Sequence, residues 1–359
     1  MPERAISYVR LLSVCMTLAA AVAFPALARE MSDVLVMKNG DRLTCRVKSL
    51  DAGVLKVDLD YVDGTISIDW LKVARVESKF LFLVHLQDGS IYSGKVIQAD
   101  AAEGTPIKFE IRPEEGQSAV VEKSKVVQMR QTSDTFVTRL SGTITLGSSF
   151  AKGNNARQYN LGSELDYQQA RWGANLSMNS NLSSSTGAAA ATRNQVDLGS
   201  YRMLQRTNYF VAGAFGFLQS SVQEVQRQTI LAGSVGRFLK NTNRVRLSVQ
   251  GGLGWQRTIY TPSPEAPQKQ DTGVALVSSS LEAFNFKKSR FDLVGSLVPA
   301  VTEPGRVFAK VNATYYLKLF GKINWNLSFY GNWDTQPPAH LPGSDYGSST
   351  GLSYTFGNK

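Results

Sequence analysis

The chain has 359 residues, which is enough for two domains, and a formal net charge of +10. Only two cysteines are present, Cys15 and Cys45, so neither a fold held by several disulfides nor a cysteine metal cluster is possible. Residues 132–359 hold 22 Lys and Arg against 12 Asp and Glu, whereas residues 30–131 hold 14 against 16.

The first 28 residues predict a secretory signal peptide. Arg4 and Arg10 precede an apolar run over residues 11–27, and the run ends in the small-x-small sequence Ala26-Leu27-Ala28. A transmembrane anchor is the alternative, but the run is short for a spanning helix. Cleavage after Ala28 would leave Cys45 as the single thiol of an exported protein. For a basic exported protein, anionic lipid is the expected partner, and nucleic acid is not.

Residues 29–131 predict a periplasmic β domain made of two repeats, about 33–78 and 80–131. Each repeat opens with a hydrophobic hairpin pattern around Asn39-Gly40 or Asp88-Gly89, and the two glycines are 49 residues apart. These pairs are typical of two-residue hairpin turns in which both residues have positive φ. A later β-rich run recurs after 53 residues. The pattern therefore favours two SH3-like or Sm-like β modules.

Little in this domain points to chemistry. Its acidic residues Asp58, Asp60, Asp63 and Asp69 match no metal-ligand spacing, and we interpret them as a solvated turn. Cys45 aligns with Gly94 of the second repeat, which indicates a packed small side chain. We predict no catalytic residue, cofactor site or metal site.

Residues 132–359 predict an antiparallel transmembrane β-barrel of about 12 strands. The clearest strand is 322–333, where apolar Ile323, Trp325 and Leu327 alternate with polar Asn324 and Asn326. Similar alternation recurs along the whole region. Three segments break it, and a β-bulge in each would explain the change of parity: 226–239, 271–284 and 287–301.

A soluble β-sandwich would also alternate, but the connections favour a barrel in a bilayer. Short turns are expected at 168–171, 205–208, 240–244, 286–288 and 320–322. Longer joins are expected at 151–156, 183–192, 258–270, 302–306 and 334–345. Short turns at one rim and long loops at the other are typical of barrels in the outer membrane of Gram-negative bacteria.

Residues 136–356 resemble the domain of unknown function 481 family of salt-induced outer-membrane proteins. The resemblance rests on G-T-I-T-L-G-S-S-F-A-K-G-N-N from Gly142, on Trp333-Asp334 with Pro337-Pro338, and on the last strand 351–356. K-N-G-D-R-L-T from Lys38 is similar to an extension found on some members. The resemblance implies an outer-membrane barrel whose activity is unsettled. Gly357-Asn358-Lys359 departs from the terminal aromatic residue of many such barrels.

If the polar parity faces the lumen, several side chains acquire expected positions. Charged residues expected in the lumen are Arg139, Arg157, Glu164, Asp166, Arg246 and Lys310, and they suggest a weak preference for anions. Aromatic residues expected at the membrane interfaces are Tyr167, Trp172, Tyr209, Trp255, Tyr315, Trp325 and Trp333. Basic residues expected beside lipid head groups at the short turns are Arg206, Lys240, Arg244, Lys287, Lys288, Lys318 and Lys322.

Three functions compete at this point. The first is a small-solute channel or a permeability or envelope-stress protein. The second is an anchored protein whose periplasmic domain binds a periplasmic protein or a cell-wall partner. The third is an outer-membrane hydrolase that uses His340 with Ser344 or Asp345. A single loop histidine is weak support for catalysis, so an enzyme is not predicted.

Overall fold

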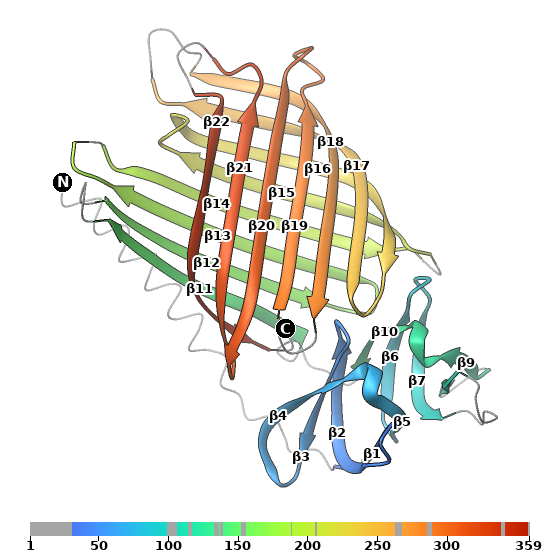
Figure 1. Ribbon diagram of the computed structural model, residues 1–359. Coiled ribbons are helices and arrows are strands. Elements are labelled where there is room, and N and C mark those ends of the chain that lie inside the picture. The colour runs from blue at the N-terminus through green and yellow to red at the C-terminus, as the bar shows by residue number, and fades with distance from the viewer. Residues whose placement is uncertain are drawn as a thin grey trace.

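The computed structural model describes residues 31–98, 106–113, 117–132, 136, 139–151, 156–187, 189–204, 207–262, 268–285, 289–338 and 342–357. The predicted signal peptide, His340, Arg206, Lys287 and Lys288 lie outside the described residues. Two β assemblies follow one another along the chain (Figure 1). Among the described residues, no helix is long and apolar enough to cross a membrane.

The N-terminal assembly is a ten-stranded antiparallel sheet, which we call the N-terminal sheet. Its strands run in the order β4-β3-β2-β10-β6-β7-β8-β9, and β1 and β5 pair beside β2. A short 3₁₀ helix precedes the last strand of each half. The elements are β1 Asp33–Met37, β2 Arg42–Asp51, β3 Val54–Leu59, β4 Val62–Asp69, η1 Trp70–Lys72, β5 Val73–Glu77, β6 Leu81–Leu86, β7 Ile91–Gln98, β8 Lys108–Arg112, β9 Ala119–Glu122, η2 Lys123–Lys125 and β10 Val126–Gln131.

Both halves of the N-terminal sheet contribute to one hydrophobic core. Trp70 of the first half packs against Phe109 of the second, with ring centroids 5.8 Å apart. Cys45 is buried in this core, and burial followed by the negative charges of Asp33 and Asp58 raises its pKa to about 12. A thiol with so high a pKa is inert, in keeping with a packing role.

The turns at Gly40 and Gly89 differ from the sequence prediction. Only the glycine has positive φ, +93° and +85° respectively, and four residues separate the paired strands. Each glycine N–H donates to the carbonyl of the last strand residue, Met37 or Leu86, at 3.0 and 3.1 Å. The tight turn with two positive φ angles is found elsewhere, at Ala52-Gly53 between β2 and β3.

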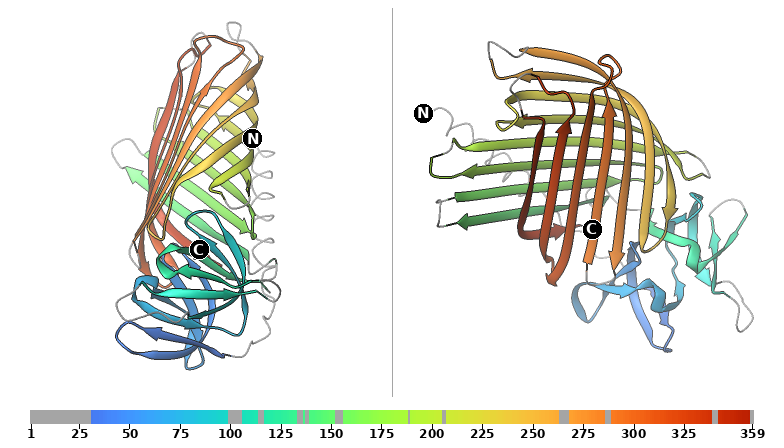
Figure 2. Two further views of the ribbon diagram at one scale, coloured as in Figure 1. Left: turned by 90° about the vertical axis from the view of Figure 1, so that its right-hand side faces the viewer. Right: turned by 45° about the horizontal axis from the view of Figure 1, so that its top comes forward.

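The C-terminal assembly is a closed antiparallel barrel of twelve strands, as predicted. Each strand pairs with the next, and β11 pairs with β22 to close the ring (Figure 2). The strands are β11 Leu140–Ala151, β12 Ala156–Gln168, β13 Trp172–Ser184, β14 Ala191–Met203, β15 Tyr209–Ser220, β16 Val225–Asn241, β17 Val245–Tyr260, β18 Lys269–Asn285, β19 Ser289–Pro299, β20 Val307–Phe320, β21 Ile323–Asp334 and β22 Ser344–Phe356.

Short turns gather at one rim of the barrel and longer loops at the other. The short-turn rim holds the joins that follow β12, β14, β16, β18 and β20, and β11 begins there. The long-loop rim holds the other joins, including one after β15 that sequence did not predict, at residues 221–224. This alternation follows the predicted pattern.

The outer surface of the barrel wall is apolar and the lumen is largely polar. Leu253, Leu297 and Leu352 are each more than half exposed on the outward register, although they lie in the middle of strands. Asn326, on the inward register of β21, is buried. Large exposed apolar side chains around a closed ring are unusual for a protein surrounded by water.

Bulges explain only one of the three segments that break the alternation. β16 carries irregularities near Val225 and Phe238, as expected for 226–239. The ladder between β18 and β19 runs without a shift, so a bulge is the wrong explanation for 271–284 and 287–301. Here apolar residues face inward instead and form a small cluster near the long-loop rim, made of Val274, Val298, Ala300 and Phe308 with Leu276.

Candidate functional site at the short-turn rim and in the lumen

The N-terminal sheet contacts the short-turn rim of the barrel (Figure 1). The side-chain amide of Asn208 donates to the carbonyl of Gln87 at 2.9 Å, and that of Asn243 donates to the carbonyl of Val126 at 2.8 Å. Gln168, at the end of β12, exchanges two 3.0 Å hydrogen bonds with Gln128. Contacts to three different barrel turns fix the sheet over this opening.

The β2–β3 turn makes the closest backbone approach. Ala52 and Gly53 have φ of +50° and +73°, which gives a two-residue hairpin turn. A Cβ atom at Gly53 would lie 2.8 Å from the carbonyl oxygen of Asn243, so only glycine fits against this barrel turn without a shift. A left-handed alanine costs about 1–2 kcal/mol, and strain of this kind is often found at functional contacts.

Asp51, just before this turn, forms an ion pair with Arg246 of the barrel lumen. The guanidinium of Arg246 also lies 3.9 Å from Glu282 on the neighbouring strand. Burial alone would raise the pKa of Asp51, but the charges of Arg246 and Arg130 outweigh it and hold the pKa below its usual value. Arg130 also donates to the side-chain oxygen of Gln168 at 2.9 Å.

Other ionisable groups of the N-terminal sheet at this contact are cationic or neutral. Burial lowers the pKa of Lys56 to about 8, although the charge of Asp51 opposes the shift. Burial, then the charges of Arg130 and Arg246, lower the pKa of His85 to about 4, so His85 is neutral at pH 7. Asp51 is therefore a carboxylate placed among positive charges.

The structure places four of the predicted lumen charges on the inward register. Glu164 and Asp166 lie there on β12, Arg246 on β17 and Lys310 on β20. Arg157 departs from the prediction because it shares the outward parity of the exposed Tyr159 and Leu161 on β12.

Arg139 also departs from the prediction. It precedes β11 and contacts the carbonyl of Thr132 at 3.5 Å, so it lies outside the strand that would carry it into the lumen.

Inward charges do not support the expected excess of positive charge. On the inward register of the described strands the cations are Arg193, Arg246, Arg290, Lys310 and Lys318, and the carboxylates are Glu164, Asp166, Asp197, Glu282, Asp292, Asp334 and Asp345. The carboxylates are no fewer than the cations. Part of the basic excess of this region lies at the short-turn rim, where Lys240, Arg244 and Lys322 are exposed.

Two ion-pair networks hold the long-loop rim. The almost fully buried Arg306 donates to Glu303 at 2.7 Å and to Asp334 at 2.6 Å. Asp345 accepts hydrogen bonds from Arg193 at 2.5 Å and from Ser220 at 3.2 Å. Arg193 lies on β14 and Asp345 on β22, so the second network joins strands that are not neighbours in the barrel.

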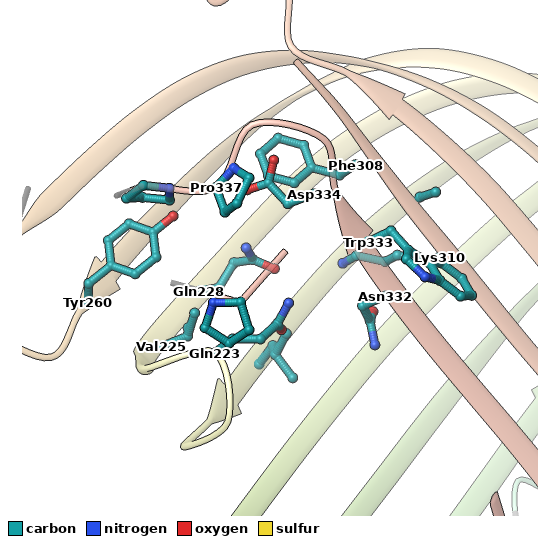
Figure 3. A pocket seen from close by; sticks show the side chains of 14 residues that line it. Gln223, Val225, Gln228, Tyr260, Phe308, Lys310, Asn332, Trp333, Asp334 and Pro337 are labelled. Atoms are coloured by element: carbon teal, nitrogen blue, oxygen red, sulfur yellow. The ribbon is translucent and has the colours of Figure 1, made fainter. Parts of the chain in front are cut away.

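A small cavity lies near these networks. Gln228 and Tyr260 from one wall and Lys310 and Asn332 from the other line it, and Pro337 of the β21–β22 join covers one side (Figure 3). The cavity therefore lies inside the barrel wall, next to the β21–β22 join of the long-loop rim.

Most of the predicted interface aromatic residues lie near a rim on the outward register. Tyr167, Trp172, Tyr209 and Trp325 lie close to the short turns, whereas Trp255 and Trp333 lie toward the long loops. Tyr315 and Trp255 each lie five residues from the end of their strand, farther than the other five. Tyr167 packs on Trp172 at 5.1 Å.

The described residues contain no cluster of three or more side chains able to hold a metal ion. Asp345, which a hydrolase using His340 would have needed, is bound to Arg193 and Ser220. Asp58 is bound by Arg46 at 2.5 Å and by Lys48 at 3.0 Å.

Sequence reasoning missed the residues at the short-turn rim. Asp51-Ala52-Gly53 is an ordinary turn sequence, and its partner Arg246 lies 195 residues away. The one available signal was the glycine that follows Asp-Ala between two β-rich runs. This glycine indicates a tight turn, but it does not show which residues the turn contacts.

Comparison with known proteins supplies a family and fold neighbours. The family model described as a protein of unknown function, DUF481, matches residues 144–356. Among solved structures, the chain is similar to the NanC porin, with 11% identity and a TM-score of 0.38 over 59% of this chain and 99% of that one. It is also similar to the translocator domain of the autotransporter NalP from Neisseria meningitidis, with 13% identity and a TM-score of 0.34 over 60% and 87%. No curated protein matches the sequence.

Proposed function

The chain belongs to the DUF481 family, and we propose that it forms a channel-like barrel in the Gram-negative outer membrane, with its own N-terminal sheet as a cap over one end. The single observation that carries the proposal is the ion pair between Asp51 of the sheet and Arg246 of the lumen. In this arrangement the N-terminal sheet is periplasmic, and the short-turn rim opens toward it.

The membrane location is supported by the barrel wall. A bilayer requires every backbone hydrogen bond to be satisfied within the protein, and the closed ring of twelve strands meets this requirement. Its outward leucines have a favourable environment only in lipid. Fractionation should recover the protein with outer membranes, and an unheated sample should migrate differently from a heated one on a gel.

The cap is supported by the chemistry of the contact. Its direct bonds are few and polar, which suits a contact that separates. Buried side-chain atoms of Asn208, Asn243 and Arg130 have no hydrogen-bond partner within the described chain. Each such atom lowers the net stability of docking, since an unsatisfied buried polar atom costs about 1–3 kcal/mol.

Planar-bilayer conductance of the full chain tests the cap. Asp51→Asn and Arg246→Gln should each raise the open probability, because each removes the charge-assisted bond of the closed state. Such a bond contributes about 2 kcal/mol, which corresponds to a change of roughly 30-fold. The double variant Asp51→Asn/Arg246→Gln should raise the open probability no further than either single variant, because all three remove the same bond.

Arg112→Gln is the matched control. Arg112 forms an exposed ion pair with Glu110 within the N-terminal sheet and forms no hydrogen bond or ion pair with the described part of the barrel, so its loss should leave conductance unchanged. Equal conductance of the parent chain and both single variants would refute the cap.

A second function, binding of an envelope partner, is favoured by one observation. β4 and β9 are the ends of the strand order in the N-terminal sheet, and their unpaired edges can accept a further strand. Pull-down of cell-wall polymer or a periplasmic protein by the parent chain, but not by a chain with Thr65→Pro in β4, would support it. An unchanged pull-down would count against β4 as the docking edge. We propose no enzymatic function.

A further inference from the structure

Lys310 is an inward cation without an ion-pair partner within 4.0 Å among the described residues. The three inward arginines each have one: Arg193 pairs with Asp345, Arg246 with Asp51 and Arg290 with Asp292. Lys310 lies between Ser296 and Asn332 in the β19–β20–β21 ladder, and neither neighbour carries a charge. A cation in a narrow lumen that no carboxylate contacts attracts mobile anions.

Lys310 also lies where two cavities meet. It lines the cavity at the long-loop rim (Figure 3) and a second, smaller cavity deeper in the barrel. Gln228 lines both cavities as well. A solute that enters from the long-loop rim therefore meets Lys310 and Gln228 before it reaches the deeper lumen.

The wall opposite Lys310 presents an acceptor. Asp197 lies on β14, six strands from β20 in a ring of twelve, and it lines the deeper cavity together with Lys310. Its carboxylate accepts a 2.5 Å hydrogen bond from Gln195, whose own oxygen accepts from Arg193 at 2.9 Å. This chain of bonds fixes Asp197 in place, while its distance from Lys310 exceeds that of an ion pair.

Glycine gives the deeper cavity its width. A Cβ atom at Gly216, beside Asp197 in the ladder, would approach the carboxylate oxygen of Asp197 to 3.2 Å. Leu218 and Ile230 supply apolar surface on the same side. The cavity thus combines one ammonium group, one carboxylate, two side-chain amides and a small apolar wall.

We propose that this part of the lumen binds a small carboxylate that carries a hydroxyl donor. The solute carboxylate pairs with Lys310, and its hydroxyl donates to Asp197. The inference rests on the proposed function only because a channel gives the solute access to the cavity.

Titration calorimetry of the full chain in detergent tests the site, with sodium lactate as the probe and sodium propionate as the matched anion without a hydroxyl. The parent chain should bind lactate more tightly than propionate. Lys310→Gln should weaken lactate binding at least about tenfold, and Lys310→Arg should retain most of it. Asp197→Asn should weaken lactate binding to the propionate level.

Lys318→Gln is the control, because Lys318 lies on the inward register of the same strand but is exposed at the short-turn rim. Its lactate affinity should equal that of the parent chain. No lactate binding by the parent chain, or equal binding by a Lys310→Gln variant that keeps its heat-modifiable gel migration, would overturn the site. Binding is measured without current, so a chain that binds lactate but never conducts refutes the channel and keeps the site.

Discussion

Replacing Gly89 with alanine should separate the cap from the barrel. Gly89 has φ of +85°, and a Cβ atom there would collide with the backbone carbonyl of Thr207 in the β14–β15 turn. Gly40 occupies the equivalent turn of the first half, with φ of +93°, and a Cβ atom there would meet nothing within 4 Å. The two alanine variants carry the same backbone strain but differ in the collision.

The expected difference follows from these two terms. Alanine at either position destabilises the N-terminal sheet by about 1–2 kcal/mol, because its backbone must adopt a left-handed conformation. The collision at residue 89 adds about 1–3 kcal/mol, the usual cost of forcing an extra carbon into a packed contact. Separation of the N-terminal sheet from the barrel removes the collision but not the backbone strain. Gly89→Ala should therefore shift the equilibrium toward the uncapped state by roughly 5- to 150-fold relative to Gly40→Ala.

Single-channel recording in planar bilayers measures this shift as open probability. Full chains with either substitution should show the same heat-modifiable gel migration, which verifies that the barrel is folded. Gly40→Ala should behave as the parent chain, and Gly89→Ala should stay open for longer. If the two variants gave equal open probability, the contact between the Gly89 turn and the barrel would play no part in closure.

Two further results are expected. Burial and two nearby arginines lower the pKa of His85 to about 4. Neutral His85 therefore contributes its full stabilisation of the closed state above its ordinary pKa of about 6.5. This stabilisation is lost as the pH falls from about 6.5 toward 4, by at most about 1.4 kcal/mol per pH unit. Open probability should therefore rise between pH 7 and pH 5, and His85→Gln should remove that rise. Phe109→Ala should lower the free energy of unfolding of the N-terminal sheet by about 3–5 kcal/mol in denaturant titrations, while the barrel keeps its heat-modifiable migration.

The barrel was predictable because its two faces meet different surroundings along every strand. Ile323, Trp325 and Leu327 lie on the outward register as their alternation indicates. The alternation gave the wrong interpretation where apolar residues face the lumen. Val274 and Val298 face inward under the long loops, and sequence alone could not distinguish such a cluster from a bulge. A period of two assigns faces but does not show which inward positions are covered.

The candidate site was not predictable for a different reason. Glycine at positions 40 and 89 has the same local signal, and both turns form in the same way. Only one of them contacts the barrel, because that depends on how the N-terminal sheet is oriented over the rim. Likewise, nothing near Asp51 in the sequence distinguishes it from Asp60, and its importance comes from Arg246, almost 200 residues later.

The charges at the short-turn rim also explain how a cap could open without a prohibitive cost. Removing one partner of a buried ion pair normally leaves an isolated charge, which costs about 3–5 kcal/mol. Here Arg246 keeps Glu282 at 3.9 Å when Asp51 leaves, and Asp51 passes into water with its turn. Neither charge is stranded in the open state. A fixed structural anchor has no need of this second carboxylate, whereas a contact that closes and opens does. Because Glu282 stabilises Arg246 when Asp51 has left, Glu282→Gln should destabilise the open state. The open probability of this variant should therefore be lower than that of the parent chain.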